Sequence, residues 1–354
     1  MKKIALSLVL FCLCHLTACG GGKTVSGAVV ERVLPEDGGP ASFVLQTDGG
    51  DRVGILLTED TQVISWIGGV TRDDLLSPDR EGFTLSVTCG RAAPAMTAQS
   101  GETVRAYTAE TVEIFEALIR ENAFVLPDGA QVDLWARSSA SLYRLKDGTA
   151  LLLEEHPFGP DRVRVGGIES YDDLSEAAQK NVSAFYDRQG LLYSLEEELE
   201  RAYAAYSEQA GEGGFDAYRV GQQIAPTASN ETIMCFLTTV TLPTGSRTYT
   251  ELRLGAVFDR ETGEHLSGWE LFSCGEREAK ETILDLADVT DPALRAELEA
   301  AFQPDYLVLF PDHLEVSFPR DALPSKDGGY MMGLDYDETL RGILYGWAVP
   351  RPGT

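Results

Sequence analysis

Apolar and polar residues alternate along residues 24–115, which is the pattern of strands with one buried face. Val25, Val29 and Val33 mark a first strand, and Asp48-Gly49-Gly50 is typical of a tight hairpin turn. Further strands are expected at 42–45, 53–57, 61–66 and 83–89. The stretch 104–115 fits a strand, but its apolar residues also fit helical spacing. About five or six short strands predict a small barrel, similar to an OB fold.

Two more hairpins are expected over residues 120–170. Asp128-Gly129 lies between the apolar segments 123–126 and 131–135, and Asp147-Gly148 lies between 141–145 and 150–153. Glycine adopts a positive φ without steric cost, which is why Asp-Gly pairs favour two-residue turns between strands. This region is therefore predicted to be a pair of β-hairpins.

Residues 171–210 carry the clearest helical spacing. Ser175 precedes the first helix and Gly190 ends it, while Ser194-Leu195-Glu196-Glu197 has the form of a capping box for the second. The apolar residues are Leu174, Ala178, Val182 and Phe185 in the first helix and Leu195, Leu199, Ala202 and Tyr206 in the second. The short turn between them predicts an antiparallel helical hairpin. The glycine-rich run 211–214 then predicts a linker.

The last region, residues 215–350, mixes strands and helices. Strands are expected at 234–242, 250–258, 306–310 and 314–318. Helices are expected at 276–286 and from Pro292 onward, because proline is favoured in the first turn of a helix. The pattern predicts an α+β fold with antiparallel strands.

The chain is therefore expected to have several domains, since more than 300 residues exceed one ordinary core. The expected order is a barrel-like domain at 19–119, hairpins at 120–170, a helical hairpin and linker at 171–214, and an α+β domain at 215–350.

The N-terminus has the parts of a secretory signal. Lys2 and Lys3 precede an apolar run that is too short to span a bilayer in the mature protein. Leu16-Thr17-Ala18-Cys19 resembles the lipobox of bacterial lipoproteins, in which the cysteine is acylated and the chain is cut before it. We expect residues 1–18 to be removed and lipid on Cys19 to anchor the protein at the outer face of the cytoplasmic membrane. The alternative is an ordinary signal peptide with a chance cysteine.

Charge narrows the choice of partners. The net charge is −27, and the mature chain stands near −29 because Lys2 and Lys3 leave with the signal. Such a surface repels phosphate backbones, so nucleic acid is not an expected partner. It attracts a cationic protein or peptide ligand and raises the association rate of that ligand. The alternative explanation of the negative charge is that it keeps an exposed protein soluble.

Three cysteines remain after the signal and the anchor, namely Cys89, Cys235 and Cys274. Their number does not indicate a disulfide scaffold, and their spacing does not suit zinc. Two alternatives stay open: a disulfide between Cys235 and Cys274, which 38 residues separate, or three reduced thiols.

The sequence carries no catalytic signature, and no catalytic, cofactor-binding or metal-ligating residue is expected. His156, His265 and His313 have no histidine or cysteine four residues away, and turn histidines are ordinary surface residues. The crowded acids Asp335, Asp337 and Glu338 could form a glycosidase pair only with a suitable spatial gap.

A resemblance lies in the last region. The segment Leu252–Glu264, with its Asp259-Arg-Glu-Thr-Gly-Glu turn, and the segment Phe310–Phe318 resemble the extracellular domain of the lysozyme-sensing anti-sigma factor family of Gram-positive bacteria. The same domain precedes the catalytic domain of some peptidoglycan deacetylases. The resemblance covers about residues 215–345 and implies an α+β fold that binds a cationic protein. The chain departs from the family in the loops 243–247 and 320–330, where the binding site is expected.

Three functions stay open. The first is a non-enzymatic binding or sensing module of the cell envelope. The lipid anchor, the expected division into several domains and the resemblance to the anti-sigma factor domain support it. The second is a cell-wall hydrolase that acts on peptidoglycan through carboxylates. The third is a solute-binding lipoprotein, although such proteins usually show repeated βα units with parallel strands. We expect the first.

Overall fold

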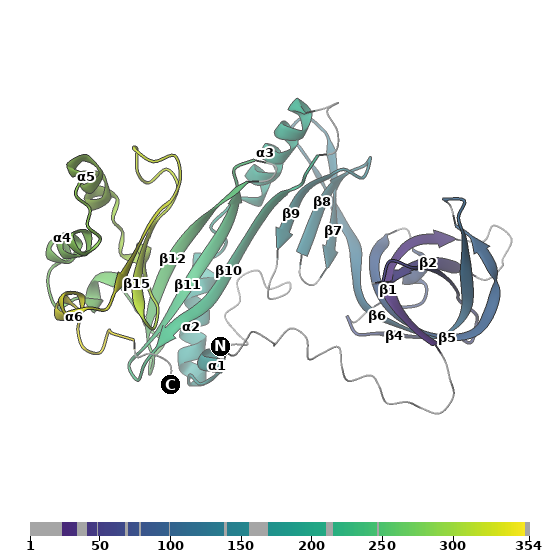
Figure 1. The fold of residues 1–354 in the computed structure, drawn as a ribbon, viewed down its shortest axis with the longest axis horizontal. Helices are drawn as coiled ribbons and strands as arrows, with labels where there is room; N and C mark the ends of the chain where they lie inside the picture. The colour runs from purple at the N-terminus through teal and green to yellow at the C-terminus, as the bar shows by residue number, and fades with distance from the viewer. Residues whose placement is uncertain are drawn as a thin grey trace. The chain divides into compact units, whose positions relative to one another are not determined.

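A computed structural model describes residues 23–33, 41–47, 49–67, 70–77, 79–98, 100–137, 140–155, 169–209, 215–245 and 248–350 (Figure 1). The expected signal at 1–18, Cys19 and the linker at 211–214 lie outside these ranges. The described chain is mostly β, and it divides into two compact units, Met1–Arg120 and Glu121–Thr354. Each unit is described by itself below.

The first unit is a closed barrel of five strands, which confirms the barrel expected from the sequence (Figure 1). Its strands pair in the order β1-β2-β3-β6-β5 and back to β1, and the β3–β6 pair is parallel while the others are antiparallel. The strands are β1 Lys23–Val33, β2 Ser42–Thr47, β3 Arg52–Leu56, β5 Arg80–Thr97 and β6 Thr103–Val125. A short strand, β4 Gln62–Ser65, pairs in parallel with β6, and a 3-10 turn, η1, spans Asp74–Leu76.

Alternate side chains along these strands point inward and form the core of the barrel. Phe43, Ile55, Leu85, Val112 and Ile114 point into one core and are at most 1% exposed. The stretch 104–115, which fitted either a helix or a strand, is a strand because Val112 and Ile114 alternate into this core while Glu113 and Phe115 stay outside.

The second unit is built on a twisted sheet with the strand order β13-β12-β11-β10-β9-β8-β7. Neighbouring strands are antiparallel except for β9 and β10, which are parallel. The strands are β7 Gln131–Arg137, β8 Ala140–Leu145, β9 Ala150–Glu155, β10 Tyr218–Ser229, β11 Ile233–Pro243, β12 Tyr249–Asp259 and β13 His265–Leu266.

Both predicted Asp-Gly turns are confirmed. Gly129 and Gly148 each have a φ of 89°, in the region that glycine favours. The side chains of Asp128 and Asp147 accept hydrogen bonds from backbone N–H groups two residues on, which closes each turn.

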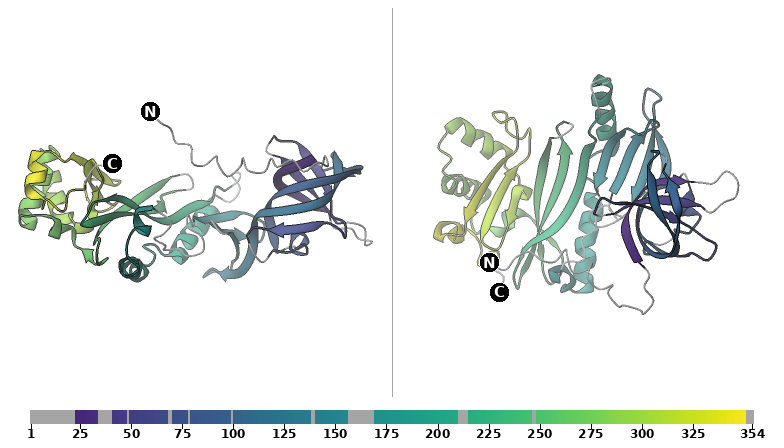
Figure 2. Two further views of the ribbon diagram at one scale, coloured as in Figure 1. Left: turned by 90° about the horizontal axis from the view of Figure 1, so that it is seen from below. Right: turned by 45° about the vertical axis from the view of Figure 1, so that its right-hand side comes forward.

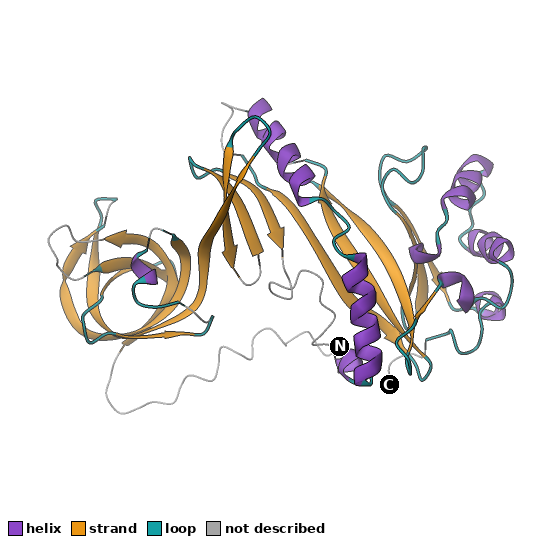
Figure 3. Ribbon diagram, turned by 180° about the vertical axis from the view of Figure 1, so that it is seen from behind, coloured by secondary structure: helices purple, strands orange, loops and turns teal. Residues whose placement is uncertain are grey.

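The helices form where they were expected, but they do not form a helical hairpin. After a first short helix, α1 Glu169–Asp172, α2 spans Glu176–Gln189 and α3 spans Leu195–Glu208. Ser175 and Ser194 cap them by accepting hydrogen bonds from backbone N–H groups three residues on. The apolar face of α2 packs against β10–β12, whereas that of α3 packs against β7–β10. Each helix buries its stripe on the sheet, so the two follow one another along it (Figure 3).

A smaller layer completes the second unit. It holds the antiparallel strands β14 Leu307–Leu309, β15 His313–Phe318 and β16 Tyr330–Asp335, the 3-10 turns η2 Gly268–Leu271 and η3 Pro304–Tyr306, and the helices α4 Glu276–Leu286, α5 Pro292–Ala301 and α6 Glu338–Ile343. The small sheet lies between these three helices and the strands β11 and β12 (Figures 1 and 2). Residues of both sheets and of all three helices share one core.

The domain limits expected at 170 and 214 do not coincide with the division between the two compact units. Both fall inside the second unit, because the chain leaves the sheet at β9, forms α2 and α3 on it, and returns as the neighbouring strand β10. Helices α2 and α3 therefore form a crossover connection between the parallel strands β9 and β10. Residues of β7–β9, before the crossover, and of β10, after it, share one core with α3.

Candidate functional site

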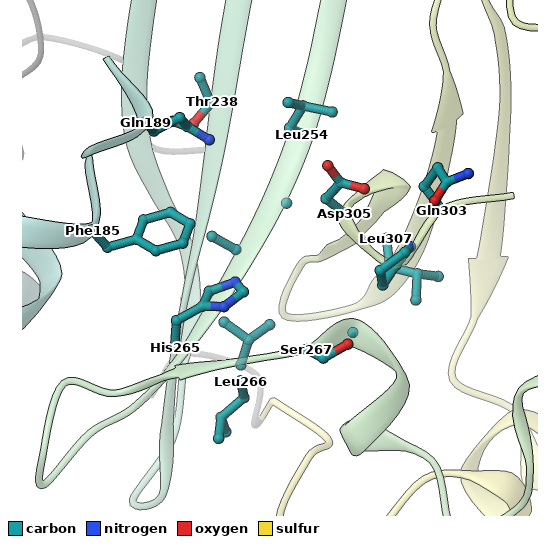
Figure 4. A pocket seen from close by; sticks show the side chains of 15 residues that line it. Phe185, Gln189, Thr238, Leu254, His265, Leu266, Ser267, Gln303, Asp305 and Leu307 are labelled. Atoms are coloured by element: carbon teal, nitrogen blue, oxygen red, sulfur yellow. The ribbon is translucent and has the colours of Figure 1, made fainter. Parts of the chain in front are cut away.

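A cavity of about 300 Å³ lies at the open edge of the large sheet in the second unit (Figure 4). Strand β13 pairs with β12 only at Val257 and Phe258, so the edge of β12 at Leu254–Ala256 lines the cavity instead. Helix α2 borders one side, and η2 and η3 border the other. The cavity therefore joins four elements that are far apart in the sequence.

The turn between β12 and β13 sets one wall. The carboxylate of Asp259 accepts hydrogen bonds from the backbone N–H groups of Glu261 and Thr262, at 3.0 and 2.8 Å, and from the Thr262 hydroxyl. Gly263 closes the turn with a φ of 71°. The Asp-x-x-Thr-Gly pattern singled out in the sequence is thus a structural turn. It delivers the next strand residue, His265, to the cavity.

His265 was expected to be an ordinary turn histidine, and it is indeed exposed. Its ring nevertheless stacks on Phe185 of α2, with 4.4 Å between the ring centroids (Figure 4). Desolvation lowers the pKa of His265, and the carboxylates of Glu270 and Asp305 oppose that shift. The imidazole therefore stands at the cavity mainly in its neutral form at pH 7.

Two glycines let the backbone walls come together. A Cβ on Gly255 of β12 would lie 2.8 Å from the Leu307 carbonyl carbon and still closer to its oxygen. A Cβ on Gly268 of η2 would lie 3.0 Å from the Pro304 carbonyl carbon. Both neighbours are backbone atoms that cannot rotate away. Only glycine allows these approaches, so the cavity has fixed walls.

Three polar residues at the cavity come from α2, β11 and η3. Gln189, the last residue of α2, has a buried side-chain oxygen without a hydrogen-bond partner among the described residues. Thr238 of β11 is 1% exposed, and Asp305 of η3 is exposed. The remaining lining is largely apolar and includes Leu254, Val257, Leu266 and Leu307. The arrangement suits a ligand with an apolar body and hydrogen-bond donors.

Sequence reasoning missed Gln189, Thr238 and Asp305. Each lies in an otherwise ordinary helix end, strand or turn, and only the packing of α2 and η3 around the edge of β12 brings them to one cavity. The spacing of these three residues in the sequence therefore does not predict a shared cavity.

The acids considered for catalysis have structural surroundings. Asp337 caps α6, where its side chain accepts a hydrogen bond from the Leu340 N–H at 2.8 Å. Glu338 lies in the first turn of the same helix, where a negative charge is favoured by the helix dipole. Asp335 ends β16. None of the three lines the cavity.

The other sequence candidates are dispersed. His156 and Cys19 lie outside the described residues. His313 binds the neighbouring carboxylate of Asp312, at 2.7 Å, and stacks on Phe310. The sulfurs of Cys235 and Cys274 are free in the structure, Cys235 buried in β11 and Cys274 partly exposed before α4. Burial raises the pKa of both thiols.

The loops expected to hold the family's binding site lie elsewhere. Loop 243–247 joins β11 and β12, with Ser246 and Arg247 outside the described residues, and loop 320–330 leads from β15 into β16. Neither contributes to the lining of the cavity.

The outer face of β2 and β3 in the barrel is covered by the chain itself. Ala98, directly after β5, and Val104 of β6 pack on Val44 of β2, which is 0% exposed. A Cβ on Gly54 of β3 would lie 3.1 Å from both Met96 and Ala106.

Within the described ranges, every helix is too short or too polar to cross a membrane. The same ranges hold no group of three or more His, Cys, Asp or Glu side chains placed to bind a metal ion.

A search of protein-family models finds no match to the chain, and a search of curated proteins finds none either. Two solved structures are similar to it. A member of the DUF3298 family from Bacteroides fragilis NCTC 9343 is 13% identical, over 66% of this chain and 93% of that one, with a TM-score of 0.34. A DUF3298 family protein from Pseudomonas aeruginosa PAO1 is 16% identical, over 61% of this chain and 95% of that one, with a TM-score of 0.30. No function follows from likenesses of this size.

Proposed function

We propose that this protein is a lipid-anchored module of the cell envelope that binds a ligand without transforming it, through the cavity at the edge of β12. The cavity carries this proposal, because it combines fixed backbone walls, an apolar lining and the unmet side-chain oxygen of Gln189 in one concave place. The residues that line it include no nucleophile paired with a base, as acyl or glycosyl transfer would need.

The anchor rests on the N-terminal sequence. Lys2, Lys3, the apolar run and Leu16-Thr17-Ala18-Cys19 supply a signal and a lipidation site. Strand β1 begins at Lys23, so only three residues would separate the lipidated cysteine from the barrel. The barrel would then lie within about 14 Å of the membrane surface, the reach of four extended residues. Its strand order and single parallel pair resemble an OB fold.

A panel of small solutes tests the proposal. The mature chain is melted with cationic, neutral and anionic organic solutes, beside Leu254→Trp, whose indole would occupy the cavity. We expect at least one solute class to raise the melting temperature of the wild type and to leave that of the variant unchanged. Equal shifts in both proteins, or none in the wild type, would contradict binding at this cavity.

A cationic protein, such as a lysozyme, is a second candidate ligand. The net charge of −27 and the resemblance of residues 215–345 favour it. Titration with lysozyme at about 0.1 M and 1 M salt separates a true site from charge attraction, because the Debye length falls from about 10 to 3 Å. Saturation at a fixed ratio that persists in high salt supports this ligand, and binding that vanishes there excludes it.

The hydrolase alternative is tested separately from the lysozyme titration. Incubation with purified peptidoglycan is expected to release no soluble fragments, whereas release would favour a hydrolase. The size of the cavity itself, about 300 Å³, favours a solute-binding role among the alternatives.

A further inference from the structure

The cavity has a one-sided charge. Among the described residues that line it, Asp305 is the single side chain with a formal charge at neutral pH, and no lysine or arginine takes part. His265 is held mainly neutral, as described above. The lining therefore favours a cation over an anion, which the carboxylate of Asp305 would repel.

A second carboxylate strengthens this field. Glu270, in η2, accepts a hydrogen bond from the backbone N–H of Ser267 at 2.6 Å, and Ser267 lines the cavity. The capping box that Ser267 and Glu270 form holds this carboxylate near the His265 ring. Glu270 does not itself line the cavity, but its carboxylate and that of Asp305 both act electrostatically on the His265 ring.

The remaining surfaces favour a hydrogen-bond donor on an apolar stem. Gln189 has a buried side-chain oxygen that lacks a hydrogen-bond donor among the described residues, and leaving such an acceptor unmet is unfavourable. Leu254, Leu266 and Leu307 supply apolar walls (Figure 4). A protonated amine carries three N–H donors and no acceptor, which suits the carboxylate of Asp305.

From this lining we propose that the cavity binds a protonated primary amine on a short aliphatic stem, with Asp305 as its ion-pair partner. The inference rests on the proposed function, because it names the ligand chemistry of the same cavity. Such an amine has two sources, a free small molecule or the side chain of a lysine on a protein.

Three probes with the same stem isolate the head group: pentylammonium, 1-pentanol and pentanoate. Each is titrated into the mature protein, and the NMR signals of the His265 ring report occupancy, with those of His313 as the distant control. We expect saturable shifts at His265 and affinities that fall in the order ammonium, alcohol, carboxylate.

Charge-matched variants assign the ion pair. Asp305→Asn is expected to weaken pentylammonium binding about three- to fivefold, the worth of one partly exposed ion pair, and to leave 1-pentanol unchanged. Asp327→Asn removes the same charge from an exposed position of the β15–β16 loop outside the lining, and should leave both probes unchanged. An Asp305→Asn protein that binds pentylammonium as the wild type does would overturn the assignment.

The outcomes separate this inference from the proposed function. Alcohol or carboxylate binding that equals or exceeds ammonium binding overturns the amine and leaves the cavity as a ligand site. A His265 ring that responds to none of the probes overturns both the amine and the proposed cavity site.

The two possible sources of the amine, a free small molecule or a lysine side chain, are separated with pentalysine and its Nε-acetylated form. Asp305-dependent binding of pentalysine alone points to a protein side chain, and binding of pentylammonium without pentalysine points to a free amine.

Discussion

The close approach of β12 to β14 predicts a large effect for Gly255→Ala. The added Cβ would lie 2.8 Å from the Leu307 carbonyl carbon and 3.1 Å from the Val308 Cα, and closer still to the Leu307 oxygen. All three atoms belong to the backbone, so relief requires the two sheets to move apart. Leu307 and Val257 belong to the core between those sheets. Overpacking of this kind costs about 3 kcal/mol or more, the upper end of its usual range.

Urea unfolding of the second unit measures this loss. Trp269 packs against Phe302 in the same core, with 5.4 Å between ring centroids, and its fluorescence follows the transition. Gly342→Ala in α6 is the matched control, because nothing lies within 4 Å of its added Cβ. The control should be neutral or more stable by up to about 1 kcal/mol, through helix propensity. A Gly255→Ala protein within about 0.5 kcal/mol of the wild type would refute the reasoning.

Three further changes have directions set by the structure or the sequence. Arg253→Met leaves the buried carboxylate of Glu315 without its bidentate partner, at 2.7 and 3.1 Å, and should cost about 2–3 kcal/mol in urea unfolding. Adding Glu315→Gln should recover part of that loss. Burial raises the pKa of Glu198, with Arg201 opposing, so its charged form disfavours folding. The stability of Glu198→Gln relative to wild type should therefore rise as the pH increases above 4.5 and level off past the raised pKa, and a flat difference would contradict this. Cys19→Ser should release the protein from membranes or leave it unprocessed, and a variant that is cut and still sediments with membranes would disprove the anchor.

Local patterns predicted most of the elements. The helix expected at 276–286 and the one expected to begin at Pro292 match the limits of α4 and the start of α5. Aspartate–glycine turns located the hairpins of β7, β8 and β9 because their conformation depends on the two residues alone. Strand β10 was missed, since Gly221, Pro226 and Ser229 interrupt its apolar residues and only pairing with β9 and β11 holds it extended.

Packing between distant segments could not be predicted. The stripes of α2 and α3 are alike in the sequence, and nothing in either shows that one covers β11 and the other β9. The cavity depends on the same information, because Gly255 and Gly268 read as ordinary glycines until β14 and η3 are seen against them. Residues such as Asp305 gain a role only from that contact.

The most direct test of the central claim is the position of a bound amine. Intermolecular nuclear Overhauser effects are measured between the methylene protons of pentylammonium and the mature protein. Binding in the cavity predicts contacts from the stem to the ring of His265 and to the methyl groups of Leu254 and Leu307, which all line it. Contacts confined to the barrel, or to the loops at 243–247 and 320–330, would contradict the cavity as the ligand site.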